Sequence, residues 1–159
     1  MSFASMLGGL VKKKVKFVVV GGVAATAHGS SRVTNDLDVC YDTNLANIVA
    51  LASLLAHWKA YPRGVEPGLP FIMDDRTLRG APILTLTTAE GDIDVLDVIA
   101  GVGPYEQVRK HSEKINALGV SFRVIDLPSL IKAKRAAGRP RDFDHLPELE
   151  ALLALRRAK

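Results

Sequence analysis

Two aspartates stand two residues apart in the apolar run DLDVCY, at positions 36 and 38. Alternate side chains of a β-strand point to the same face, so the carboxylates of Asp36 and Asp38 are expected to lie close together. Such a pair repels unless a cation lies nearby, and a hard divalent ion prefers oxygen ligands. The pair therefore predicts a divalent-metal site. The alternative interpretation is a salt bridge to Arg32.

A second acidic strand follows in GDIDVLDV, residues 91–98. Asp92 and Asp94 share one face of this strand, whereas Asp97 has the opposite parity. If the strand lies beside residues 36–41, Asp94 completes a cluster of three carboxylates. Such a cluster is typical of the magnesium sites that stabilise the attacking and leaving oxygens in phosphoryl-type transfer. The alternative is an exposed polar strand face.

A glycine pair, Gly21 and Gly22, separates the β-branched run VKFVVV (residues 15–20) from a short helix that Gly29 ends. A helix amino terminus binds phosphate through free N–H groups, and glycine lets the backbone approach an anion closely. The pair therefore indicates a phosphate-binding turn, with an ordinary tight turn as the alternative. His28, at the end of this helix, is expected to serve packing rather than catalysis.

Basic residues gather in LIKAKRAAGRPRDFDHL, residues 130–146. Such a cluster can neutralise a triphosphate or contact a nucleic-acid backbone. A solvated helix surface is the alternative interpretation. The basic residues are Lys132, Lys134, Arg135, Arg139 and Arg141.

These residues must be positioned by a mixture of helices and strands, which predicts an α/β (α+β) domain with a mixed sheet. The patterns predict strands at 15–20, 36–41, 82–88, 92–98 and 122–126, the third and fourth joined by a tight turn at AEGD. They predict helices over 3–14, over 45–58 behind a cap at Asn44, over 127–137 behind a cap at Asp126, and from near Asp144. The proline- and glycine-rich segment 61–80 is expected to be irregular.

The composition is that of an ordinary globular protein, with 159 residues, 48% hydrophobic and 24% charged. We expect one domain over residues 1–159, with carboxy-terminal helices from about 127. Cys40 is the only cysteine, which excludes an internal disulfide and favours a reducing, cytoplasmic setting. No apolar segment is long enough to predict a membrane span, and the net charge of +4 is compatible with phosphate-bearing partners.

The order of these motifs resembles that of the minimal nucleotidyltransferases of the DNA polymerase β-like superfamily. That family is marked by an apolar strand, a Gly-Gly or Gly-Ser pair, a short helix, an Asp-x-Asp strand and a later acid. The matching runs here are VVVGGVAA, DLDV and GDIDVL. The forms GGVAATAHGSSRVTNDLD and LIKAKRAAGRPRDFDHLPEL are most similar to the small bacterial and archaeal branch that includes toxin–antitoxin nucleotidyltransferases.

The resemblance implies a palm-like fold and a Mg²⁺-dependent transfer of NMP from a nucleoside triphosphate to a hydroxyl group of an RNA, a protein or a small molecule. It implies two Mg²⁺ ions held by Asp36, Asp38 and Asp94, with Asp94 also activating the attacking hydroxyl. It implies nucleotide contacts at Gly21, Gly22, Arg32, Thr34, Lys134 and Arg139. A toxin–antitoxin partner is a further expectation.

Two other functions compete with this one. A dinucleotide-binding fold also begins with a strand, glycines and a helix, and Asp42 lies where its ribose-binding acid would be. However, GGVAATA lacks the G-x-G-x-x-G spacing, and that fold gives no reason for Asp36 and Asp38. The second alternative keeps the fold without catalysis, as an antitoxin-like or nucleic-acid-binding protein that uses its basic residues.

Overall fold

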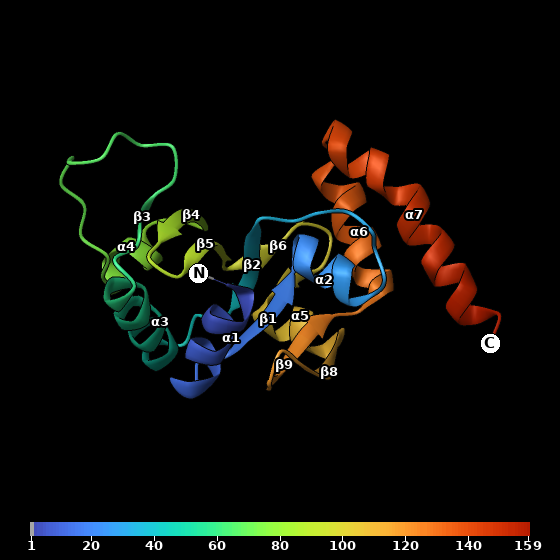
Figure 1. Cartoon of the computed structure of the whole chain (residues 1–159), viewed down its shortest axis with the longest axis horizontal. Coiled ribbons are helices and arrows are strands. Elements are labelled where there is room, and N and C mark those ends of the chain that lie inside the picture. Colours follow the sequence, from blue (N-terminus) through green and yellow to red (C-terminus); the bar gives the residue numbers. More distant parts are fainter. Residues whose placement is uncertain (1) are drawn as a thin grey trace.

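The computed structural model describes residues 2–159 and is built on a mixed sheet of seven strands (Figure 1). The strand order across the sheet is β3-β4-β5-β2-β1-β9-β8, and β6 pairs with β7 in a separate two-stranded sheet. The strands are β1 (Phe17–Val20), β2 (Asp36–Tyr41), β3 (Tyr61–Pro62), β4 (Ile83–Thr88), β5 (Gly91–Leu96), β6 (Val98–Ile99), β7 (Gly103–Pro104), β8 (Ser112–Ala117) and β9 (Val120–Ile125).

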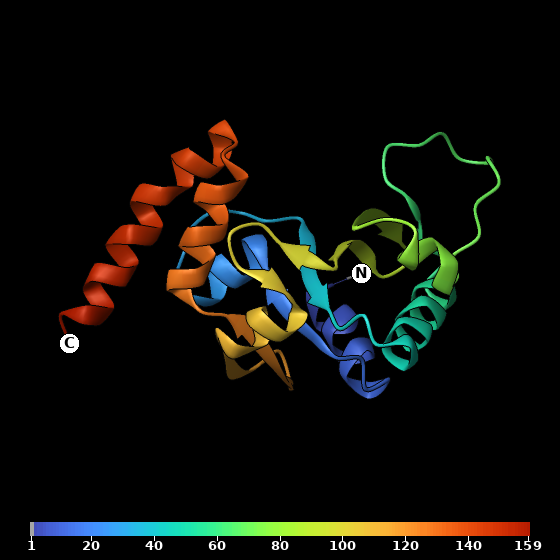
Figure 2. The same ribbon diagram turned by 180° about the vertical axis from the view of Figure 1, so that it is seen from behind.

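The helices flank this sheet, and two of them extend from one end of it. In Figure 1 the α6–α7 pair lies at one end of the molecule and the segment between β3 and α4 at the other. Figure 2 views the molecule from behind and brings α5 to the front. The helices are α1 (Phe3–Lys12), α2 (Gly21–Ala27), α3 (Leu45–His57), α4 (Asp75–Arg79), α5 (Tyr105–Lys110), α6 (Leu127–Ala137) and α7 (Pro140–Arg157).

The centre of the sheet holds the strands that carry the first two motifs. All four residues of β1 are buried, and Leu37 and Val39 of β2 are fully buried. Strand β2 pairs antiparallel with β1 and parallel with β5. The antiparallel β1–β2 pair excludes the dinucleotide-binding alternative, because that fold begins with two parallel strands.

The predicted fold class is confirmed, as are several helix boundaries. The Asn44 side chain accepts a hydrogen bond from the Ala46 N–H, 3.0 Å away, and so caps α3. Asp126 caps α6 in the same way, accepting from the Ser129 N–H at 2.8 Å. Short polar side chains at these positions satisfy N–H groups that a helix start otherwise leaves unpaired. The tight turn between β4 and β5 also forms, with Thr88 paired to Gly91.

The start of the last helix was predicted wrongly. Helix α7 begins at Pro140, not near Asp144, immediately after Gly138 ends α6 with a left-handed backbone (φ 66°). Proline suits the first helical position, since its missing N–H would be unpaired there. Asp142 then accepts a hydrogen bond from the backbone N–H of Arg139, which closes a capping box.

The chain between the predicted elements is more regular than expected. The segment 61–80 is not wholly irregular, since it contains β3 and also α4, whose first turn is capped by Asp74. Strand β8 and helix α5 were not predicted. Strands β8 and β9 form a hairpin whose turn residues Leu118 and Gly119 both have positive φ, as a type I′ turn requires.

Within residues 2–159 no helix combines the length and the apolar character that crossing a membrane would require.

Candidate active site

Three carboxylates meet on neighbouring strands at the centre of the sheet. The parallel register of β2 and β5 places Asp38 beside Asp94 and Asp36 beside Asp92. One oxygen atom from each of Asp36, Asp38 and Asp94 lies within 4.8 Å of the other two. We call these three residues the triad, and the triad together with Asp92 the acidic edge. The structure thus brings together the three acids that the sequence indicated.

Asp38 is half-buried, and one of its two carboxylate oxygens lacks a partner among the described residues. Its Oδ1 is buried without a hydrogen bond in the part of the chain that the structure describes. Burial, and then the charges of Asp94 and Asp36, raise the pKa of Asp38 to about 8. Burial also raises the pKa of Asp94, although a hydrogen bond from Arg63 opposes this shift. A cation beside Asp38 would therefore stabilise the charged form of its carboxyl group.

The glycine pair lies directly against these acids. Gly21 has φ 64°, and a Cβ there would overlap the Asp38 carboxylate. A Cβ on Gly22 would lie 2.5 Å from the Thr34 Oγ1, which donates a hydrogen bond to the Asp36 carbonyl at 3.2 Å. Both glycines therefore have a packing role beside Asp38 and Thr34. Among residues 2–159, no side chain caps α2, whose first residue is Gly21.

The cation that contacts the acidic edge is Arg63, which sequence reasoning missed. Its Nη2 lies 2.7 Å from the Asp94 Oδ1, its Nε 3.5 Å from the Asp92 Oδ2, and its Nη1 3.7 Å from the Asp36 Oδ2. Arg63 stands between Pro62 and Gly64 at the start of the segment expected to be irregular. No local pattern there points toward acids some thirty residues along the chain.

Arg32 does not form the salt bridge that was the alternative to a metal site. Its Nη1 donates to the Arg141 carbonyl at 3.2 Å, so its side chain is turned toward α7. In this structure Arg32 therefore contacts the helix next to the site, not the triad. Its predicted nucleotide contact stays a prediction.

The two basic residues predicted to bind triphosphate converge on a buried acid, Asp142. The Nε and Nη2 of Arg139 donate to the two Asp142 oxygens at 2.7 and 3.1 Å, and the Lys134 Nζ lies 3.4 Å from Oδ1. Burial of Asp142 would raise its pKa, but the bonds from Arg139 and the charge of Lys134 outweigh burial and lower it. The charge of Lys134 also opposes, as the smallest of the contributions, the rise in the pKa of Asp38.

The remaining acids of the second strand are not members of the triad. Asp97 follows the end of β5, and its charge acts on Cys40 and Tyr41, whose pKa values are each raised to about 12, first by burial and then by this charge. Asp92 lies on the face of Asp94, but it accepts a hydrogen bond from the Thr87 hydroxyl at 2.9 Å. The alternation in the sequence therefore separated Asp94 from Asp97 correctly.

The segment that joins α2 to β2 is fastened to α7. Glu148 accepts hydrogen bonds from the hydroxyls of Ser30 and Ser31, at 2.5 and 2.8 Å, and lies 3.1 Å from the His145 ring. These hydroxyls, Ser30 first, lower the pKa of Glu148 to about 2. Helix α7 thereby holds the segment that leads to Thr34 and the triad. His28 is buried and donates its Nε2–H to the Ile125 carbonyl at 2.6 Å, in keeping with a packing role.

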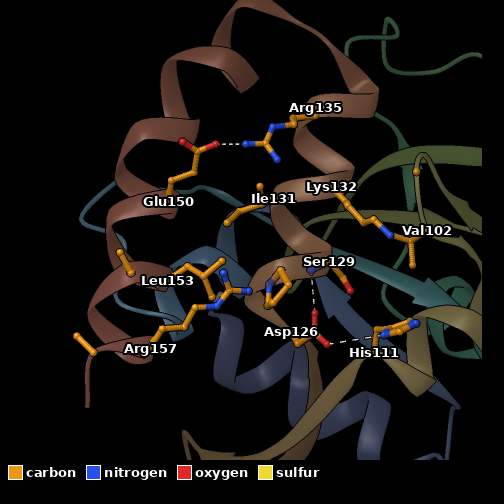
Figure 3. Close-up of a pocket in the computed structure, with 14 residues that line it drawn as sticks. Val102, His111, Asp126, Ser129, Ile131, Lys132, Arg135, Glu150, Leu153 and Arg157 are labelled. Carbon is orange, nitrogen blue, oxygen red and sulfur yellow. Dashed lines mark hydrogen bonds and ion pairs between the residues drawn. The ribbon is translucent and has the colours of Figure 1, made fainter.

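The other basic residues of α6 face a cavity that lies away from the acidic edge. Lys132 and Arg135 line a cavity of about 1110 Å³ between α6 and α7, where Arg135 pairs with Glu150 (Figure 3). His111 and Asp126 lie at its far side, and no residue of the acidic edge lines it. The basic cluster of the sequence is therefore divided between two faces of the molecule.

Comparison with known proteins bears on the fold. No protein-family model matches this chain, and no curated protein matches it in sequence. Among solved structures it is similar to a "putative nucleotidyltransferase" from Thermotoga maritima, with a TM-score of 0.57 and 14% sequence identity. The match covers 93% of this chain and 94% of that one. The chain thus has a nucleotidyltransferase-like fold, a mixed sheet flanked by helices.

Proposed function

We propose that this protein is a Mg²⁺-dependent nucleotidyltransferase, which transfers NMP from a nucleoside triphosphate to a hydroxyl group of an RNA, protein or small-molecule acceptor. The observation that carries the proposal is the triad itself: three carboxylates from β2 and β5 with ligand atoms within 4.8 Å, on a nucleotidyltransferase-like fold. A fold alone does not define a function, and it is these side chains that indicate the chemistry.

The triad fits a hard divalent ion. Its ligands are all carboxylate oxygens, which Mg²⁺ prefers, and the buried Asp38 Oδ1 has no other partner among the described residues. Asp36, Asp38 and Asp94 would hold the metal, and we expect two ions. When bound, Mg²⁺ offsets the negative charge that develops on the attacking and leaving oxygens.

The chain's own residues have separate roles in the transfer. Asp94 accepts the proton of the acceptor hydroxyl as that oxygen attacks the α-phosphorus; the bond from the α-phosphorus to its bridging oxygen breaks, and pyrophosphate leaves. The backbone at Gly21 and Gly22 faces the phosphates, where the first N–H groups of α2 lack helical partners. Thr34 supports Asp36 through its carbonyl, and Lys134 and Arg139 supply positive charge beside the triphosphate.

The remaining parts of the proposal concern the whole chain. We assign residues 1–159 to one catalytic domain, whose C-terminal helices α6 and α7 bring Lys134 and Arg139 toward the triad. We also propose a cytoplasmic protein of the toxin–antitoxin-type branch, on the resemblance of the runs around Gly21 and Lys134. Arg32 reaches a nucleotide only if its side chain leaves the Arg141 carbonyl.

One observation favours a second candidate, a catalytically silent binding protein on the same fold. Arg63 already contacts three carboxylates of the acidic edge, which is what a protein that had dispensed with metal would need. Against this stands Asp38, because Arg63 leaves its buried Oδ1 unpaired. A merely structural Arg–carboxylate cluster has no need for that acid.

The test is transfer of a labelled nucleotide. The protein is incubated with Mg²⁺, total RNA and protein, and each of the four triphosphates labelled in turn at the α- or the γ-phosphate. We expect the α-label and not the γ-label to become attached to an acceptor, and we expect EDTA or Asp36→Asn to abolish attachment. Equal labelling by wild type and Asp36→Asn would refute the proposal, and transfer of the γ-label would indicate a kinase instead.

A further inference from the structure

Arg63 is attached to the sheet beside the acidic edge and does not extend into solvent. Its side chain is 30% exposed, and its Nη2 donates to the Leu86 carbonyl at 2.8 Å as well as to Asp94. Its backbone N–H donates to the Thr85 carbonyl at 3.0 Å, directly after β3 pairs with β4. Arg63 is therefore held in place both by its backbone and by its guanidinium group.

Arg63 contacts three of the four acids of the acidic edge. It forms ion pairs with Asp94, Asp92 and Asp36, whereas the Asp38 Oδ1 has no partner among residues 2–159. Within residues 2–159 no other lysine or arginine forms an ion pair with these four acids, since the nearby Lys134 is paired with Asp142. Four carboxylates thus share one fixed cation, and the Asp38 Oδ1 has no hydrogen-bond partner among the described residues.

We propose that Arg63 is the resident counter-ion of the acidic edge, which holds Asp94 in place and sets the affinity of the triad for divalent ions. This inference rests on the metal site proposed above. The fixed positive charge relieves repulsion among the carboxylates when no metal is bound. The same charge repels an arriving divalent cation, because it lies within hydrogen-bonding distance of one of that ion's ligands.

The proposal gives Arg63 two effects of opposite sign. In the metal-free protein, loss of the charge leaves the acidic edge uncompensated, and stability falls. In the metal-bound protein, loss of the charge strengthens the attraction between the triad and a divalent ion. A residue that served packing alone would lower stability and would not tighten metal binding.

The experiment measures Mn²⁺ binding by isothermal titration calorimetry, and thermal unfolding with and without Mn²⁺, for wild type, Arg63→Gln and Arg63→Lys. We expect Arg63→Gln to bind Mn²⁺ at least about tenfold more tightly than wild type. We expect its Tm to fall by several degrees without metal and to return close to the wild-type value with saturating Mn²⁺. Arg63→Lys keeps the charge and loses the forked contact, so its Mn²⁺ affinity should stay within about threefold of wild type.

Arg79→Gln is the matched control, because the Arg79 guanidinium pairs with Asp75 on α4 and with no residue of the acidic edge. It should leave Mn²⁺ affinity unchanged. Unchanged or weaker Mn²⁺ binding by Arg63→Gln, with wild type binding normally, would overturn the role of Arg63 and leave the metal site standing. Failure of wild type and all variants to bind Mn²⁺ would overturn the metal site, and with it this role. If Arg63→Gln does not fold, an Arg63→Lys affinity more than about tenfold from wild type would overturn the charge argument.

Discussion

The acids of the central sheet and two acids of α7 differ in the partners that compensate their charges. On α7, Asp142 accepts three hydrogen bonds from Arg139, and Glu148 accepts from two serine hydroxyls and a backbone N–H. On the sheet, Asp38 has a buried oxygen without any partner among residues 2–159. The pKa values of Asp142 and Glu148 are lowered, whereas those of Asp38 and Asp94 are raised.

This difference separates acids whose charges are compensated by donors from an acid whose charge is not. A carboxylate that is surrounded by donors is satisfied, and its charge contributes to stability at neutral pH. A buried carboxylate beside two others costs stability until a cation arrives. By this criterion Asp142 and Glu148 are structural, although Asp142 is the more deeply buried, and Asp38 is the acid that we propose to hold a metal.

The largest expected effect is on catalysis by the triad. Asp38→Asn should lower nucleotide transfer by several orders of magnitude, because the amide cannot replace the charge that holds the metal. The same variant should be as stable as wild type or more stable, since it relieves repulsion at a buried site. Label transfer and thermal unfolding on one protein preparation measure both quantities. An active or strongly destabilised Asp38→Asn would place Asp38 with the structural acids.

A matched pair of variants tests the third acid. Asp94→Ala should lower kcat by several orders of magnitude with a modest loss of nucleotide affinity, because it removes a metal ligand and the proton acceptor. Asp97→Ala should stay near wild type, since Asp97 lies beyond the end of β5. Steady-state kinetics on both variants make the comparison. Reversed results would mean that the metal site is built from the other face of the strand.

For the α7 acids the expected effect is on stability. Asp142→Ala leaves Lys134 and Arg139 without their shared partner and opens the capping box of α7. We expect a loss of about 3 kcal/mol in the free energy of unfolding, the range for a buried, charge-assisted hydrogen-bonding group. Urea denaturation measures this loss. A stability unchanged by Asp142→Ala would remove the distinction between the two groups of acids.

The pH dependence of stability should have opposite signs at Asp38 and at Glu148. The pKa of Asp38 is raised in the folded state to about 8 from 3.8, so its contribution to stability is fully present below pH 4 and is lost as the pH rises through 8. The pKa of Glu148 is lowered to about 2 from 4.5, so its contribution is present above pH 4.5 and is lost as the pH falls through 2.

Thermal unfolding between pH 3 and 9 resolves these contributions. It compares metal-free wild type with the variants Asp38→Asn and Glu148→Gln. The Tm advantage of Asp38→Asn over wild type should grow between pH 5 and 9. The Tm deficit of Glu148→Gln should be largest near pH 7 and shrink at pH 3. Parallel curves for all three proteins would contradict both assignments.

The smallest expected effect is at Lys134. Lys134→Ala should raise the KM for the nucleotide severalfold, because Lys134 supplies charge near the triphosphate, and should leave kcat nearly unchanged. Its ion pair with Asp142 adds a small loss of stability. Kinetics at fixed Mg²⁺ measure the KM. If only stability falls, Lys134 belongs wholly to the structural group.

The sequence could predict those parts of the site that depend on local spacing. The period of two along β5 assigns Asp94 to the face of Asp92, and the apolar residues around Asp36 and Asp38 identify a strand. Caps at Asn44 and Asp126 were also predictable, since they depend on a hydrogen bond within one turn of the helix. The start of α7 had a local signal that was overlooked, namely Pro140 followed by Asp142.

The partners of these acids could not be predicted, because they come from distant segments of the chain. Arg63 reaches the acidic edge only through the pairing of the two-residue strand β3 with β4. Lys134 and Arg139 meet on Asp142 because Gly138 turns the chain between two helices. Strand β8 could not be predicted because two charged residues, Glu113 and Lys114, interrupt the alternation of apolar and polar residues along it. Its turn also lacks the Asn-Gly signal of a type I′ hairpin.

The most direct measurement is anomalous diffraction from crystals grown with Mn²⁺ and a nonhydrolysable nucleoside triphosphate. The expected result is an anomalous peak bonded to carboxylate oxygens of Asp36, Asp38 and Asp94, with the triphosphate between this peak and the backbone of Gly21 and Gly22. Density for the nucleotide elsewhere, or a triad that still holds only Arg63 in the presence of saturating Mn²⁺, would contradict the assignment of this site to nucleotidyl transfer.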